Sequence, residues 1–260
     1  LAALEGADFG LAFASGMAAE TTIIATLKAG DHVVCGRDVY GGTYRVFTKV
    51  FERFGVEFTF INIHRLEELE PAMKPNTRFV WLESPSNPLL TVTDLAAAAD
   101  IAHRRGAKVV VDNTFATPYL QQPLALGADL GLHSTTKYLG GHSDVVGGAV
   151  LMKDKALYES LRFLQNAMGA VPGPLDCFLV LRGTKTLAVR MRQHCESARR
   201  IAQWLTEQKD VKHVNYPGLA SHAGHAVAQR QMRDFGGMMS IELEGGLDRN
   251  IAFSTKTKVF

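Results

Sequence analysis

Short apolar runs alternate with longer segments of helical periodicity along the first 150 residues or so. Several runs, such as 107–113 ("AKVVVDN"), are apolar almost throughout instead of alternating with polar residues. This pattern is typical of strands that are buried on both faces of a parallel sheet. We therefore predict strands over residues 10–15, 31–36, 56–63, 77–84, 107–113, 129–134 and 147–152.

The segments between these runs carry apolar residues at helical spacing. Residues 16–30, 41–55 and 93–106 each end in a glycine, and glycine is common where a helix ends. A repeat of strand, helix and strand favours an α/β fold with right-handed crossovers and a mostly parallel central sheet flanked by helices.

The pattern changes beyond about residue 155. A long helical stretch over 173–208, interrupted near Gly183, precedes a strand, a helix, a second strand and a final helix. We divide the chain into a large domain over 1–180, followed by a linking helix and the start of a smaller α/β domain over 181–260. The chain does not begin with Met and stops within a helical pattern, so we expect a fragment cut at both ends.

Composition narrows the class of protein. The 260 residues are 47% hydrophobic and 21% charged, with a net charge of +2. This balance gives no reason to expect a nucleic-acid or membrane surface, and the apolar runs are too short to span a bilayer. The three cysteines form no CxxC pair, which favours inert thiols in a reducing cytoplasm.

Polar residues follow the predicted strands and strand-to-helix turns. Ligands in open α/β sheets collect at the carboxyl edge, so these residues are candidates for a site. Taken singly, each has an ordinary explanation as a helix cap, a turn residue or a solvated lysine. The candidates are Ser15 and Gly16; Tyr40 and Arg45; Glu83, Ser84, Ser86 and Asn87; Asp112, Asn113 and Thr114; and Ser134, Thr136 and Lys137.

Together these residues supply a phosphate cradle, a carboxylate, an aromatic ring and a lysine at one edge of one sheet. The set matches the needs of pyridoxal phosphate (PLP). That cofactor requires a lysine for covalent attachment, a carboxylate for the ring nitrogen and donors for the phosphate. We expect no metal ion.

The ordered motifs identify the chain as a member of the cysteine/methionine-metabolism family of PLP enzymes, which it resembles over essentially its whole length. They are "SGM" (15–17), "VYGGTYR" (39–45), "ESPSNP" (83–88), "DNTF" (112–115), "HSTTKYLGGHSDVVGG" (133–148) and "YPGL" (216–219). The resemblance implies the fold type I architecture of PLP-dependent transferases, a sulfur amino acid as substrate, and a homotetramer built of two active dimers.

The resemblance also implies residue roles. Lys137 would carry the cofactor and then act as a mobile acid and base, Asp112 would pair with the ring nitrogen, and Tyr40 would stack on the ring. The phosphate would be held by Ser15, Ser134 and Thr136 with the backbone N–H groups of Gly16 and Met17. Thr114 would support the ring, Asn87 would reach the ring oxygen or the substrate carboxylate, and Arg45 would lie near the distal end of the substrate.

Comparison within the family favours the cystathionine γ-lyase and γ-synthase branch. Gly42 stands where methionine γ-lyases typically have a cysteine, and Arg45 argues modestly against O-acylhomoserine sulfhydrylases. Cystathionine β-lyase remains an alternative. From a different class, a non-catalytic α/β scaffold also remains open, whereas a dinucleotide-binding protein would need G-x-G-x-x-G.

Overall fold

The apolar runs of the sequence form the strands of one central sheet in the computed structural model, which describes residues 1–258. All seven predicted strands are confirmed, with shifts of a few residues at their ends. They are β1 Phe9–Phe13, β2 His32–Gly36, β3 Glu57–Ile61, β4 Thr77–Glu83, β5 Lys108–Asp112, β6 Leu130–Ser134 and β7 Gly148–Met152.

The sheet has the order β1-β7-β6-β5-β4-β2-β3. Neighbours from β3 through β2, β4 and β5 to β6 are parallel. Only β7 runs the other way, pairing antiparallel with β6 and with the edge strand β1. The prediction of a mostly parallel sheet is therefore confirmed, and the carboxyl ends of β4, β5 and β6 lie side by side.

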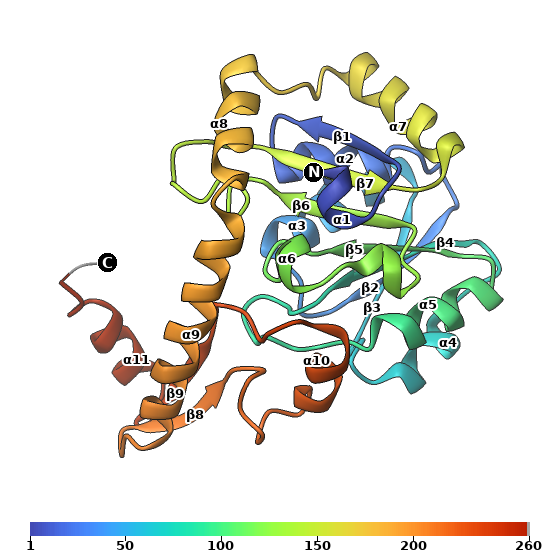
Figure 1. Ribbon diagram of the computed structural model, residues 1–260. Helices are drawn as coiled ribbons and strands as arrows, with labels where there is room; N and C mark the ends of the chain where they lie inside the picture. The colour runs from blue at the N-terminus through green and yellow to red at the C-terminus, as the bar shows by residue number, and fades with distance from the viewer. Residues whose placement is uncertain (259–260) are drawn as a thin grey trace.

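Helices cover both faces of the sheet (Figure 1). On one face lie α2 (Gly16–Ile24), α3 (Gly41–Lys49) and α7 (Lys155–Met168), and on the other lie α4 (Leu69–Ala72) and α5 (Leu95–Arg104). Successive strand residues point to opposite faces, so Val110 joins the first core while Val109 and Val111 join the second. This is why the runs are apolar without alternation.

Several short elements complete this part of the chain, with α1 before β1 and the others between strands. They are α1 (Ala2–Glu5), α6 (Thr117–Leu120) and the 3-10 helices Phe51–Phe54, Leu66–Glu68 and Pro123–Leu126.

Helix α7 is an element that the sequence analysis missed. Its signals were present: the Asp154 side chain accepts hydrogen bonds from the backbone N–H groups of Ala156 and Leu157, and Gly169 ends the helix with a φ of 77°. Leu161 is fully buried in the first core. The helix therefore helps to cover the face that also carries α2.

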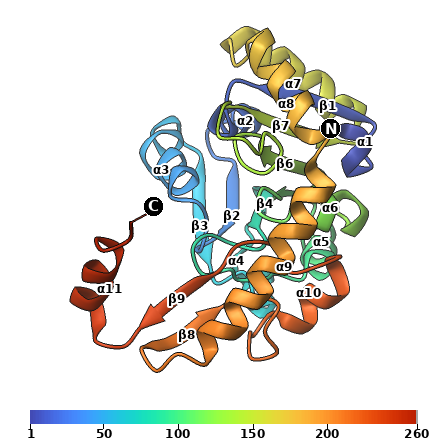
Figure 2. The same ribbon diagram turned by 60° about the vertical axis from the view of Figure 1, so that its left-hand side comes forward.

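The C-terminal third begins with α8 (Pro174–Thr184) and α9 (Leu187–Thr206), which run past one end of the sheet (Figures 1 and 2). The predicted interruption falls at residues 185–186, close to Gly183. Beyond it lie β8 (Val211–Asn215), α10 (His225–Gln231), β9 (Ser240–Leu243) and α11 (Gly246–Ser254), with β8 and β9 antiparallel. Within residues 1–258, no helix combines the length and the apolar character needed to cross a bilayer.

A separate apolar cluster of Ala198, Ala202, Val214 and Tyr216 joins α9 to this small sheet. Another cluster, which includes Leu139, Met191 and Ala228, joins α9 and α10 to the large sheet's loops. We propose that the division near residue 180 separates two units that share α9 as their connection.

Candidate active site

The carboxyl ends of three adjacent strands bring the predicted polar residues together. Glu83 ends β4 and is the register partner of Asp112, which ends β5. Ser134 ends β6, the next strand along. The chain positions of these residues span about fifty residues, and the parallel pairing collects them on one edge.

Helix α2 begins at this edge. Ser15 is its N-cap, with an extended backbone, and its hydroxyl oxygen accepts a hydrogen bond from the Ala18 N–H at 3.0 Å. The first turn leaves the N–H groups of Gly16 and Met17 without intrahelical acceptors. Such a helix start attracts an anion, because the free N–H groups and the helix dipole both favour negative charge.

Gly16 lets β6 approach that helix start closely. A Cβ atom built on Gly16 would lie 3.1 Å from Cβ of Ser134 and 3.4 Å from its Oγ. Gly148 allows a second close approach, since a Cβ there would lie 2.3 Å from the Ser15 carbonyl oxygen. The Ser134 hydroxyl therefore lies beside the free N–H groups of α2, as expected of a phosphate cradle.

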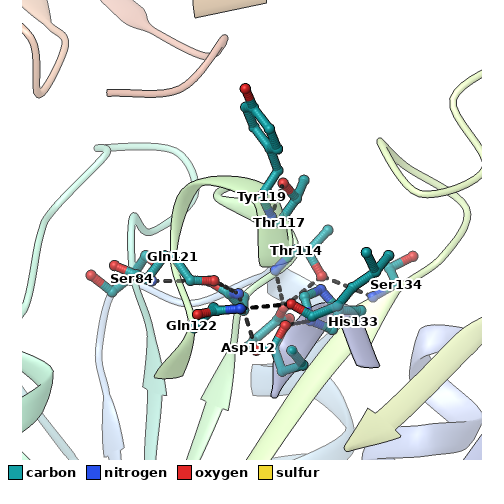
Figure 3. Close-up of polar contacts among 12 residues, drawn as sticks. Ser84, Asp112, Thr114, Thr117, Tyr119, Gln121, Gln122, His133 and Ser134 are labelled. Carbon is teal, nitrogen blue, oxygen red and sulfur yellow. Dashed lines mark hydrogen bonds and ion pairs between the residues drawn. The ribbon is translucent and has the colours of Figure 1, made fainter. Parts of the chain in front are cut away.

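Asp112 is held by its neighbour Thr114 (Figure 3). The backbone N–H and the hydroxyl of Thr114 both donate to Asp112 Oδ1, at 2.9 and 2.5 Å. The same hydroxyl oxygen accepts the Ser134 N–H at 2.8 Å. Thr114 thus connects the carboxylate at the end of β5 to the end of β6.

Burial raises the pKa of Asp112, while the Thr114 hydrogen bonds and the charge of His133 lower it. Burial has the largest effect, so Thr114 and His133 do not fully stabilise the ionised form of Asp112. A cation placed against Asp112 would stabilise its charged form. The protonated nitrogen of a bound heterocycle is such a cation.

Lys137 extends from the turn that follows β6. Its side chain is exposed and forms no hydrogen bond or ion pair with any residue in the range 1–258. The turn is closed by the backbone bond from the Gly141 N–H to the Lys137 carbonyl at 2.7 Å. The amine is therefore free to react or to move, while its backbone is held.

Two residues that the sequence analysis missed support this turn. Arg190 of α9 donates to the carbonyl oxygens of Tyr138 at 2.7 Å and Gly183 at 2.9 Å. A Cβ on Gly183 would lie 2.1 Å from the Gly140 carbonyl oxygen, so only glycine lets α8 pack this closely. Both contacts join distant segments, and no local motif indicates them.

Tyr40, the N-cap of α3, forms another side of the site. Its backbone N–H donates to Glu83 Oε2 at 2.7 Å, and its side chain is 45% exposed. Gly42 lies beneath the ring, because a Cβ there would lie 2.3 Å from Tyr40 Cε1 and 2.8 Å from the Met17 sulfur. A side chain at position 42 would displace the ring or Met17.

The remaining predicted residues have different surroundings. The Thr136 hydroxyl exchanges hydrogen bonds with the backbone of Gly147, at 3.1 and 3.3 Å. Asn87 is half-buried, and Arg45 is exposed on α3. Neither of these two side chains has a hydrogen bond or ion pair with the part of the chain that the structure describes.

A buried polar network lies behind Asp112 and was also missed. Glu5 Oε2 lies 3.1 Å from His133 Nε2, and Asn113 Nδ2 lies 3.3 Å from Glu5 Oε1. Gln121 donates to the Asn113 side chain at 2.9 Å and to the Ser84 carbonyl at 2.8 Å (Figure 3). The network ties α1 to the ends of β4, β5 and β6 and so stiffens the edge that carries the site.

The residues gathered at this edge fit the chemical groups of PLP. The helix start and Ser134 suit a phosphate, the buried Asp112 suits a protonated ring nitrogen, and the free amine of Lys137 suits covalent attachment to an aldehyde. The glycine at position 16 lets Ser134 approach the helix start, and the glycine at position 42 lets the Tyr40 ring and Met17 pack against the start of α3.

Comparisons with known proteins agree with this fit. The sequence pattern of the family described as "Cys/Met metabolism PLP-dependent enzyme" matches residues 1–260. A probable cystathionine gamma-synthase of Herpetosiphon aurantiacus is 57% identical over 259 residues, which are 100% of this chain and 81% of that protein. A cystathionine gamma-lyase of Bacillus subtilis is 51% identical over 99% of this chain and 68% of that protein.

A similar fold is known from experiment. The crystal structure of metB from Corynebacterium glutamicum superimposes with a TM-score of 0.98 at 52% sequence identity. The match covers 100% of this chain and 68% of that one.

Proposed function

The chain belongs to the family of Cys/Met metabolism PLP-dependent enzymes, and from this premise we propose that it is a trans-sulfuration enzyme. It acts on a sulfur amino acid by γ-elimination or γ-replacement, as a cystathionine γ-lyase or γ-synthase. The observation that carries the proposal is the free Lys137 amine on the same sheet edge as Asp112 and the start of α2. The names of the relatives support the choice of substrate.

The binding residues fix the cofactor before any reaction takes place. The N–H groups of Gly16 and Met17 would hold the phosphate together with the hydroxyls of Ser15, Ser134 and Thr136, while Thr114 holds Asp112 in place. Asp112 would lie against the protonated ring nitrogen, which would stabilise its negative charge. When bound, PLP withdraws electrons from the bonds at Cα of the amino acid attached to it.

Lys137 moves the protons. The amine would take the proton from Cα of the substrate, give it up again, and then, as a free base, take a proton from Cβ, so that the γ-substituent can leave with the electron pair of its bond to Cγ. A general base needs to come within hydrogen-bond distance of each proton. The lack of any partner for the Lys137 side chain among residues 1–258 supports this mobility.

Tyr40, Asn87 and Arg45 orient the substrate. Tyr40 would cover the ring and lie close to the amine and the leaving group. Gly41, whose Cβ position is open, would leave room beside Tyr40 for a side chain as large as that of cystathionine, whereas the Cβ position of Gly42 is already filled by the Tyr40 ring and Met17. Asn87 would bind the ring oxygen or the substrate carboxylate, and Arg45 would face the distal end of the substrate.

Product analysis tests the position of cleavage. We expect 2-oxobutanoate and ammonia from L-cystathionine, or cystathionine from an O-acylhomoserine and cysteine. Both assays are run with the unaltered protein and with Lys137→Ala as the inactive control. Pyruvate and homocysteine as the main products would indicate β-cleavage and overturn the γ-assignment. No turnover in either assay would favour the non-catalytic scaffold.

We propose that the active protein is a homotetramer of two dimers. Apolar side chains exposed on α7 and α8 support this proposal: Phe163, Leu175 and Phe178 are 70%, 67% and 60% exposed. A mainly apolar groove of about 340 Å³ also separates α8 from β1 and β7. Monomeric proteins rarely expose large contiguous apolar patches. Light scattering of the active protein is expected to give four times the mass of one chain, and an active monomer would contradict the proposal.

The proposed setting is the cytoplasm. The three cysteines, Cys35, Cys177 and Cys195, are all free thiols, which suits a reducing compartment.

A further inference from the structure

Glu20 is a buried acid that none of the proposed roles uses. It lies within α2, the helix whose first turn faces the phosphate, and only 3% of its surface is exposed. Its Oε2 atom is buried and has no hydrogen-bond partner. Carboxylates are almost never buried in this way unless they are paired.

The groups around Glu20 are acidic or neutral. Asp112 at the end of β5 and the hydroxyl of Thr43 on α3 both act on the Glu20 carboxyl. Glu20 in turn acts on Glu83 at the end of β4 and on the thiol of Cys35 in β2. Asp38, which follows β2, acts on Glu83 as well. None of the groups that act on Glu20 is a lysine, arginine or histidine.

The carboxyl group of Glu20 therefore lies between α2, which carries it, and α3, which begins after Tyr40. Thr43 belongs to the first turns of α3, directly behind Tyr40 and Gly42, and is itself 1% exposed. Glu83, the acceptor for the Tyr40 N–H, is also buried. Because Glu20 belongs to α2 and its carboxyl group interacts with Thr43 of α3, a change in its charge acts on both helices.

We propose that Glu20 is a positioning residue that works as a neutral carboxylic acid, joining α2 to α3 through Thr43 and leaving Asp112 as the negative partner of the ring nitrogen. The proposal deepens the proposed function and rests on it where the cofactor is concerned. An ionised Glu20 would place a further negative charge near Asp112 and Glu83, and the repulsion would push these groups apart.

The electrostatics agree with a neutral acid. Burial, and then the charge of Asp112, raise the pKa of Glu20 to about 8, against the lowering effect of Thr43. Burial likewise raises the pKa of Glu83 well above its usual range. Glu20 and Glu83 thus favour their neutral forms, and Asp112, whose pKa is also raised by burial, is the acid that would face the cation.

The test compares Glu20→Gln with the unaltered protein. Glutamine keeps the shape of the side chain and cannot ionise. As a matched control, Thr22→Val changes a fully buried polar residue of the same helix whose hydroxyl bonds only the Ala18 carbonyl. Melting temperatures are measured without PLP from pH 5 to pH 9, and PLP affinity is measured from its absorbance at pH 7 and pH 9.

The sign of the stability effect follows from the raised pKa. The stability that a neutral Glu20 contributes is fully present below pH 4.5, the pKa of the group in the unfolded chain. It is lost as the pH rises towards the folded pKa of about 8. The melting temperature of the unaltered protein should therefore fall below that of Glu20→Gln over this range, by several degrees at about pH 8. Thr22→Val should shift the melting temperature by an amount that does not depend on pH.

Cofactor affinity provides a readout that a purely structural role would leave unchanged. A group with a pKa of about 8 is only about one-tenth neutral at about pH 9. From pH 7 to pH 9, PLP affinity should therefore fall about tenfold more in the unaltered protein than in Glu20→Gln. Equal pH dependence of affinity in the two proteins would overturn the positioning role, and parallel melting curves would overturn the neutral acid. If none of the proteins binds PLP, the proposed function fails, while the melting curves still decide the charge of Glu20.

Discussion

Replacing Lys137 by alanine is expected to lower turnover about 10⁴-fold or more and to remove the covalent link to PLP. The expected loss is large because one amine both attaches the cofactor and carries the protons at Cα and Cβ. The fold should remain intact, since the Lys137 side chain is exposed and has no partner within residues 1–258. The change in unfolding free energy should stay within about 0.5 kcal/mol.

Borohydride reduction followed by peptide mapping checks the attachment point. The pyridoxyl group is expected on Lys137 in the unaltered protein. The matched control is Lys155→Ala, which removes an exposed lysine at the start of α7 and should leave both the label and the turnover unchanged. A label on any other lysine of the unaltered protein would refute the assignment of Lys137.

The Asp112→Asn variant is expected to bind PLP but to lose about 10³-fold in turnover. The amide cannot supply the negative charge that keeps the ring nitrogen protonated, and removing a preorganised charge partner costs catalysis by about this amount. Binding through the phosphate and Lys137 remains. Turnover and the visible absorbance of the bound cofactor are measured together, with Asp100→Asn on the exposed side of α5 as the control.

The same variant has a predicted effect on stability. Burial raises the pKa of Asp112 in the folded chain. The folded protein therefore loses stability as the pH rises above 3.8, the pKa of this group in the unfolded chain. Without PLP, Asp112→Asn should therefore melt at a higher temperature than the unaltered protein at pH 7. Near-normal turnover in the variant would show instead that Asp112 is only a structural residue at the end of a strand.

The sequence by itself determined the sheet and indicated the residues that we propose to react. Runs such as 107–113 predicted strands buried on both faces, and the structure divides Val109, Val110 and Val111 between two cores. Asp112, Ser134 and Lys137 became candidates because they lie at or just beyond the ends of such strands. Both predictions rest on residues that are close together in the chain, and such a local pattern is visible in the sequence.

Only the tertiary structure decided which residues support the site. Glu5 contacts His133 across 128 positions of the chain, and Arg190 reaches the Tyr138 carbonyl across 52. Glu20 lies within a segment predicted to be helical, and only the packing of that helix shows that its carboxyl group lies near other acids. Burial, charge environment and hydrogen-bond partners depend on which distant segments pack together, and sequence spacing carries no record of that.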